Sequence, residues 1–91
     1  MSIKIRVPST LQPLAEGQRE LTDSSETVAA AIASLEQRYP GIGPKLLDDD
    51  GKLRRYINLY VNETDVRFLS GLDSELKDGD ELSIVPAVAG G

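Results

Sequence analysis

The sequence predicts an α+β domain in which a mixed sheet of four or five strands packs on one α-helix. Two observations lead to this prediction. Apolar and polar residues alternate near both ends of the chain and at residues 56–61, as in half-buried strands. Residues 28–39 instead repeat apolar side chains at steps of four, three and four, as in an amphipathic helix. The length of 91 residues suits one domain with one modest core.

The first part of the chain predicts a hairpin. Residues 3–7 form the first strand, which Pro8 ends. Residues 11–17 contain a proline and a glycine and are expected to be the hairpin loop, and residues 18–22 return as the second strand. The side chains on the inward face of the first strand are Ile3, Ile5 and Val7.

The helix is predicted to start after a cluster of capping residues, Asp23, Ser24 and Ser25. It ends at Pro40-Gly41, since proline cannot continue a helix. Its apolar stripe consists of Val28, Ile32, Leu35 and Tyr39, with alanines on the flanks that allow close approach to a sheet.

A turn or short 3₁₀ segment is predicted at residues 42–47, with Leu46 or Leu47 reaching the core. The following run, Asp48-Asp49-Asp50-Gly51, could suggest a metal site. A calcium loop of the EF-hand type needs further oxygen ligands at fixed spacing and a glutamate at its end, and this sequence lacks them. We therefore expect a solvated loop and no metal.

The second part of the chain predicts three strands. The clearest covers residues 56–61, with Ile57, Leu59 and Val61 on one face and Tyr56, Asn58 and Tyr60 on the other. A short fourth strand is expected at residues 65–68, a turn at 77–80 and the last strand at 81–85. The predicted core residues are Val28, Ile32, Leu35, Ile57, Leu59, Leu82 and Ile84.

This order of strand, strand, helix and three strands is typical of the β-grasp, or ubiquitin-like, fold. Parallel pairing of the first and last strands would place both of them in the interior of the sheet. We expect one such domain over residues 1–91, with a flexible C-terminal tail at residues 87–91.

Composition excludes several classes of function. The sequence has no histidine and no cysteine, which excludes imidazole bases, thiol nucleophiles, disulfides and the usual zinc sites. The net charge of −5 argues against nucleic acid and suits a partner with a basic docking surface. No apolar run is long enough to span a membrane, and the start lacks a signal-peptide core, so a cytoplasmic location is expected.

The last residues are unusual because they are small and uncharged and end on two glycines. They are Pro86, Ala87, Val88, Ala89, Gly90 and Gly91. Glycine lacks a Cβ atom and passes through slots too narrow for other residues, and six extended residues reach about 20 Å. Such a tail could carry its carboxylate into the active site of another protein, although a frayed terminus is the simpler alternative.

With this tail, the whole chain resembles the MoaD/ThiS family of ubiquitin-like sulfur carriers. The most specific similarity lies in residues 76–91, where a turn of the Asp-Gly-Asp type, an alternating strand, a proline and a Gly-Gly end follow one another. Residues 55–62 and 65–68 and the ending Pro-Ala-Val-Ala-Gly-Gly are most similar to the CysO-type branch, which supplies sulfur for cysteine biosynthesis. Small subunits of molybdopterin synthase more often carry a bulkier residue before the glycines.

The resemblance implies that an ATP-dependent enzyme adenylates the carboxylate of Gly91, and that a sulfur source then displaces AMP and leaves a thiocarboxylate. The chain itself would bind no cofactor and would not be an enzyme, because ATP is bound by the activating enzyme. The implied partners are this adenylating or sulfurtransferase enzyme and a sulfur acceptor. The acceptor is either a cysteine-synthase-like enzyme that uses pyridoxal phosphate or the large subunit of molybdopterin synthase.

Two other functions stay open at this point, a protein modifier joined to lysines through Gly91 and a plain interaction module. For any of them, the outer face with Tyr56, Asn58 and Tyr60 is the candidate docking surface, because tyrosine combines an apolar ring with a polar tip. Arg67 is a further candidate, and it could equally pair with an acid on a neighbouring strand. The alternative is that these residues only cover the sheet.

Overall fold

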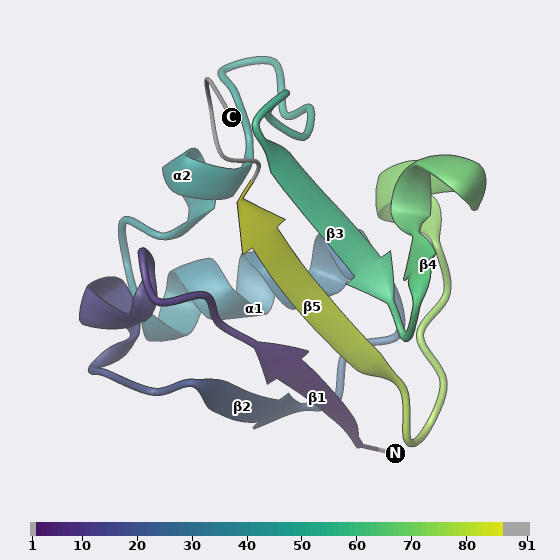
Figure 1. Ribbon diagram of the computed structural model, residues 1–91, viewed down its shortest axis with the longest axis horizontal. Coiled ribbons are helices and arrows are strands. Elements are labelled where there is room, and N and C mark those ends of the chain that lie inside the picture. Colours follow the sequence, from purple (N-terminus) through teal and green to yellow (C-terminus); the bar gives the residue numbers. More distant parts are fainter. Residues whose placement is uncertain (1, 87–91) are drawn as a thin grey trace.

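The structure is a computed structural model that describes residues 2–86 (Figure 1). Strands, helices and short 3₁₀ turns alternate along this part of the chain. In order they are β1 (Ile3–Arg6), η1 (Gln12–Ala15), β2 (Glu20–Asp23), α1 (Val28–Arg38), α2 (Gly43–Leu46), β3 (Ile57–Val61), β4 (Thr64–Asp65), η2 (Val66–Phe68), η3 (Gly71–Asp73) and β5 (Glu81–Pro86).

The strands form one mixed sheet in the order β2-β1-β5-β3-β4. β1 pairs antiparallel with β2 and parallel with β5, and β5 pairs antiparallel with β3. The last strand therefore lies in the middle of the sheet, with the first strand beside it. This arrangement confirms the predicted α+β class and the β-grasp fold.

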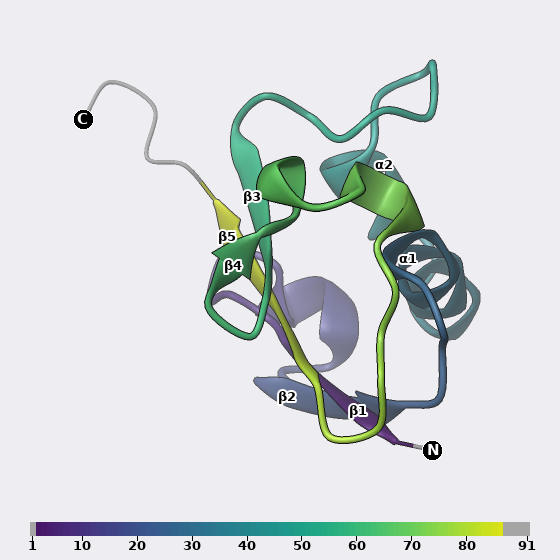
Figure 2. The ribbon, with the colours of Figure 1, turned by 90° about the vertical axis from the view of Figure 1, so that its right-hand side faces the viewer.

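Helix α1 lies against one face of the sheet and leaves the other face open (Figure 2). The core forms between the two layers, and every predicted core residue is buried in it. The turn that follows α1 also enters the core, because Ile42 and Leu46 are fully buried while Leu47 is only partly covered. The predicted short segment at residues 42–47 is thus the helical turn α2, and Leu46 is the residue that reaches the core.

The predicted start of α1 is wrong by a few residues. Thr27 is the N-cap, and its Oγ1 accepts a hydrogen bond from the backbone N–H of Ala30 at 3.1 Å. Asp23 is the last residue of β2, and its carboxylate accepts hydrogen bonds from Ser25 and from Ser34 on the helix. Asp23 therefore connects β2 to α1, and Thr27, not Asp23, caps the helix.

The fourth strand is also shorter than predicted. β4 covers only Thr64–Asp65, and residues 66–68 turn into the 3₁₀ segment η2. The reason is local, because Asp65 Oδ1 accepts the backbone N–H of Arg67 at 2.8 Å and so caps the turn. The alternation of apolar and polar residues at 65–68 resembles a strand, but the aspartate cap diverts the backbone.

Side-chain hydrogen bonds join the turn between β3 and β4 to the turn that precedes β5. Asn62, between β3 and β4, has a left-handed backbone with φ of 58°. Its side chain donates to Asp80 Oδ1 and accepts the backbone N–H of Glu81, both at 3.1 Å. The other oxygen of Asp80 accepts the backbone N–H of Lys77 at 2.8 Å. These bonds, first that from Lys77 and then that from Asn62, lower the pKa of Asp80 below its ordinary value of 3.8.

This arrangement predicts a pH-dependent contribution of Asp80 to stability. The pKa of Asp80 is lower in the folded protein than its ordinary value of 3.8. The ionised carboxylate therefore contributes fully to the free energy of unfolding above pH 3.8, and this contribution is lost as the pH falls through the lower pKa of the folded state. Asp80→Asn should therefore reduce the free energy of unfolding at neutral pH, and the difference from the wild type should shrink in acid. Denaturant titrations between about pH 7 and about pH 2 measure this difference.

The matched control is Asp50→Asn, which removes the same charge from an exposed turn. A difference between wild type and Asp80→Asn that stayed constant over the whole pH range would contradict the prediction.

Candidate functional site

The candidate site starts where β5 ends. Pro86 is the last residue of β5, is half-buried and pairs with Ile57 at the start of β3. Proline is tolerated at a strand end because its missing N–H interrupts no continuing ladder. The other residues of the predicted tail, Ala87, Val88, Ala89, Gly90 and Gly91, lie outside the described residues, as does the predicted flexibility of residues 87–91.

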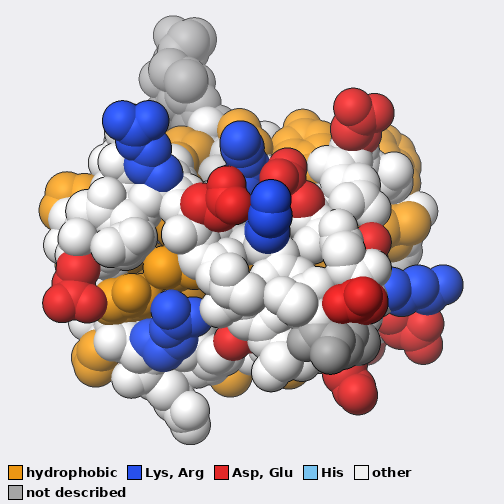
Figure 3. All heavy atoms as spheres, turned by 90° about the horizontal axis from the view of Figure 1, so that it is seen from below, with side chains coloured by type: hydrophobic (Ala, Val, Ile, Leu, Met, Phe, Trp, Pro, Cys, Tyr) orange, Lys and Arg blue, Asp and Glu red, His pale blue; other side chains and the backbone are white. Residues whose placement is uncertain are grey.

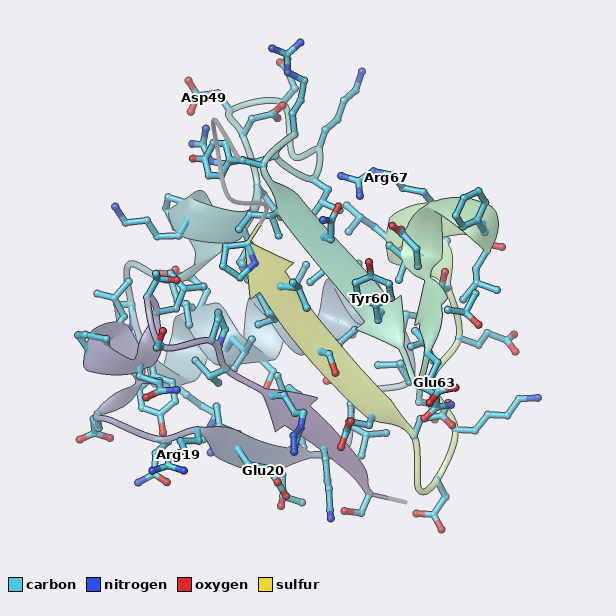
Figure 4. The ribbon with its side chains drawn as sticks, in the orientation of Figure 1. Arg19, Glu20, Asp49, Tyr60, Glu63 and Arg67 are labelled. Atoms are coloured by element: carbon cyan, nitrogen blue, oxygen red, sulfur yellow. The ribbon has the colours of Figure 1, made fainter. Side chains whose placement is uncertain are left out.

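The three residues predicted for the outer sheet face all come from β3 or the position before it. Tyr60 lies opposite Ser83 of β5, and Asn58 lies opposite Val85. Tyr56 precedes β3 and is 50% exposed, whereas Tyr60 is only partly exposed (Figure 4). The structure thus places Asn58 and Tyr60 beside β5, and Tyr56 just before the residue that pairs with Pro86.

Val85 belongs to the same surface and was not predicted. It is 41% exposed, beside Pro86 on the strand that leads into the tail. The alternation of β5 contains the signal, because Leu82 and Ile84 point inward and Val85 must then point outward.

Arg67 lies at the edge of this surface and is bonded within the chain (Figure 4). Its guanidinium donates to Asn58 Oδ1 at 2.7 Å and to the backbone carbonyl of Ile57 at 2.9 Å. It also lies 3.6 Å from the carboxylate of Asp65. Arg67 therefore fixes the orientation of Asn58 and covers part of the edge of β3 that the short β4 leaves open.

The outer face is divided by charge. On β1, Lys4 pairs with Glu20 of β2 at 3.6 Å, and Arg6 pairs with Glu81 at 3.5 Å. Figure 3, which views the molecule from the lower edge of Figure 1, shows basic and acidic side chains interspersed on that edge. The half of the face formed by the end of β5 and by β3 carries the uncharged side chains described above. A partner can displace water from this uncharged half at a lower cost than from the paired charges.

A shallow hollow lies beside the start of β3, lined by Asp48, Arg54, Arg55 and Tyr56. Asp48 does not act there as a free carboxylate, because its Oδ1 accepts the backbone N–H groups of Asp50 and Lys52 at 2.9 and 3.0 Å. The bond from Lys52 is the main reason that the pKa of Asp48 is lowered. The three aspartates thus form a structured turn, and residues 2–86 contain no group of three acidic side chains placed to hold a metal ion.

Comparison with known proteins identifies relatives over the whole chain. A model of the ThiS family matches residues 5–91. The chain is 44% identical to the sulfur carrier protein CysO of Mycobacterium tuberculosis over 93 residues, covering 100% of both chains. It is also 33% identical to small archaeal modifier protein 3 of Haloferax volcanii, again over 100% of both chains. A crystal structure of the Amycolatopsis orientalis BexX/CysO complex contains a similar fold, with a TM-score of 0.91, 43% identity and coverage of 98% of this chain and 99% of that one.

The geometry at Arg67 predicts a measurable contribution to stability. Arg67→Ala removes two hydrogen bonds to β3 and leaves the Ile57 carbonyl open to water, so the free energy of unfolding should fall by about 1 kcal/mol. Arg55→Ala, which removes an exposed arginine near the same strand, should change it by less than about 0.5 kcal/mol. Denaturant titration compares the two, and equal effects would contradict the role assigned to Arg67.

Proposed function

The chain belongs to the ThiS family, and from this membership we propose that it is a sulfur carrier, not an enzyme. The observation that carries the proposal is the Gly90-Gly91 end, which follows the central strand by only a few residues. In this proposal, the reactive group is the carboxylate of Gly91.

The chemistry has two steps, and both occur on an enzyme that binds ATP. A carboxylate oxygen of Gly91 first attacks the α-phosphate of ATP and releases pyrophosphate. Hydrosulfide supplied by a sulfur donor then adds to the acyl carbon and expels AMP, and loss of its proton leaves a thiocarboxylate. Its sulfur is a strong nucleophile without any neighbouring base, which suits a chain that has neither histidine nor cysteine. We expect this ATP-dependent chemistry in the cytoplasm.

The fold supports this proposal through the base of the tail. β5 is paired with β1 over residues 81–83 and with β3 over residues 82–86, so its last residue, Pro86, is held against Ile57. A rigid base restricts the volume that the tail can search, so the reactive end meets a partner's active site more often. The uncharged surface of Tyr56, Asn58, Tyr60 and Val85 lies beside this base and is the proposed docking face.

We propose cysteine biosynthesis as the destination of the sulfur. The identity with a CysO protein favours this pathway, and a slender Ala-Val-Ala-Gly-Gly tail suits a narrow path to a buried cofactor. In the proposed reaction, the thiocarboxylate sulfur adds to an amino-acid substrate that a cysteine-synthase-like enzyme has activated with pyridoxal phosphate. The thioester formed with Gly91 then rearranges to an amide-linked cysteine, which a peptidase releases.

A second function is favoured by a different observation. The identity with a small archaeal modifier protein supports conjugation through Gly91 to the lysines of other proteins. Intact mass after incubation with ATP, a sulfur donor and extract separates the two functions. Replacement of one oxygen by sulfur indicates a carrier, and a ladder of heavier conjugates indicates a modifier.

The proposed mechanism predicts that Gly91 must be the last residue. Deleting Gly91, or adding one residue after it, should abolish adenylation. In both variants the terminal carboxylate no longer belongs to a Gly-Gly end, so it is no longer positioned at the α-phosphate of ATP in the activating enzyme. ATP–pyrophosphate exchange catalysed by the activating enzyme measures this loss. Both variants should keep the circular dichroism and melting temperature of the wild type, and normal exchange by the truncated chain would exclude the mechanism.

The acceptor is tested with the purified thiocarboxylate. One mixture contains O-phosphoserine and the cysteine-synthase-like enzyme, and the other contains precursor Z and a molybdopterin synthase large subunit. We expect the first mixture to consume the sulfur and to form cysteine attached to Gly91, detected by mass. Consumption in the second mixture alone would assign the carrier to the molybdenum cofactor.

A further inference from the structure

The last strand pairing before the tail is that of Pro86 with Ile57. The pairing of β5 with β1 ends earlier, at Ser83, so the place where the tail leaves the sheet depends on β3. Two features stop the pairing of β3 with β5 here. Proline has no N–H to donate to a further pair, and the chain turns before Ile57, whose N–H donates to the carbonyl of Arg54 at 3.1 Å. The tail therefore begins at residue 87 for reasons present on both strands.

The turn before β3 is attached to the core through α2. The N–H of Arg54 donates to the carbonyl of Leu46 at 2.9 Å, and its Nε donates to the carbonyl of Pro44 at 2.7 Å. Leu46 is fully buried, and Ile57 is 3% exposed. A slip of one residue between β3 and β5 would turn the buried side chain of Ile57 to the outer face. Burial therefore opposes any change in the register that places the end of this pairing.

The number of residues after this pair limits the reach of the tail. Five residues, 87–91, follow Pro86, and an extended chain of five residues spans about 16–18 Å. Inside a narrow channel, one residue more or less would move the end of such a chain by about 3.3 Å. A misplacement of about 1 Å can already cost about 100-fold in rate, so the length of the tail matters to the reaction.

We infer that the strand end at Pro86 and the five residues after it set the depth of the partner sites that this carrier fits. An enzyme that acts on the carboxylate of Gly91 would hold its reacting group about 16–18 Å from the point where Pro86 is seated. The same distance applies to the activating enzyme and to the sulfur acceptor, because both act on the same end of the chain. This inference rests on the proposed function and adds a geometric condition on every partner.

The test changes the length of the tail and leaves its reactive end intact. Deletion of Ala87 keeps Val88, Ala89 and both glycines, and insertion of one alanine between Pro86 and Ala87 keeps the whole natural tail. In ATP–pyrophosphate exchange with the activating enzyme, the deletion should lower kcat at least about 100-fold. The KM for the carrier should stay unchanged, because the docking face is intact and only the carboxylate falls short. The insertion should have a smaller effect, because an added residue can loop out whereas a missing one cannot be replaced.

Ala87→Gly is the matched control, since it changes the same position without changing the length, and it should leave kcat unchanged. All three variants should keep the melting temperature of the wild type, because the changes follow the last strand. A deletion of Ala87 with normal kcat, or with a loss confined to KM, would overturn the inference. Loss of exchange on deletion of Gly91 would then still uphold the proposed function, whereas normal exchange by that truncated chain would overturn both.

Discussion

The fold and the candidate site both depend on the pairing of β5 with strands on its two sides. β1 pairs with it in parallel over residues 81–83, and β3 pairs with it antiparallel over residues 82–86. Leu82 and Ile84 of β5 are buried under α1, which secures the strand from the inner side. A tail that starts from an edge strand would move with every opening of that edge. A tail that starts from the central strand begins from a residue that is paired with β3 and continuous with a buried strand.

A five-stranded open sheet still has two edges, and arginine side chains cover a carbonyl on each of them. Arg67 donates to the carbonyl of Ile57 on β3, and Arg38 of α1 donates to the carbonyl of Thr22 on β2 at 3.0 Å. Exposed strand edges invite pairing with other chains, and a charged side chain at the edge opposes it. This protection of the two edges opposes aggregation through the sheet.

The periodicity of apolar residues predicted the helix and sheet layers of the structure. It did not predict the places where a hydrogen bond from one side chain determines the backbone conformation. The alternation in β1, β3 and β5 and the stripe of α1 determine which face is buried, so the core followed from the sequence. The cap at Thr27 and the turn at Asp65 depend on single hydrogen bonds that compete with equally plausible ones nearby. The surface positions of Tyr56 and Tyr60 were predicted from alternation, whereas the exposure of Phe68 depends on the fold of η2, which no periodicity indicates.

A carrier without a catalytic residue cannot select its partners by chemistry. The residues that precede the two glycines, Ala87, Val88 and Ala89, are small, and small side chains offer few contacts that distinguish one channel from another. In the proposed function, discrimination between an activating enzyme, a sulfur acceptor and unrelated proteins would then come from the folded domain. In the proposed function, the uncharged half of the outer face would offer contacts that different partners share. In such a carrier, the tail supplies reactivity, and the face beside it determines which enzyme receives that tail.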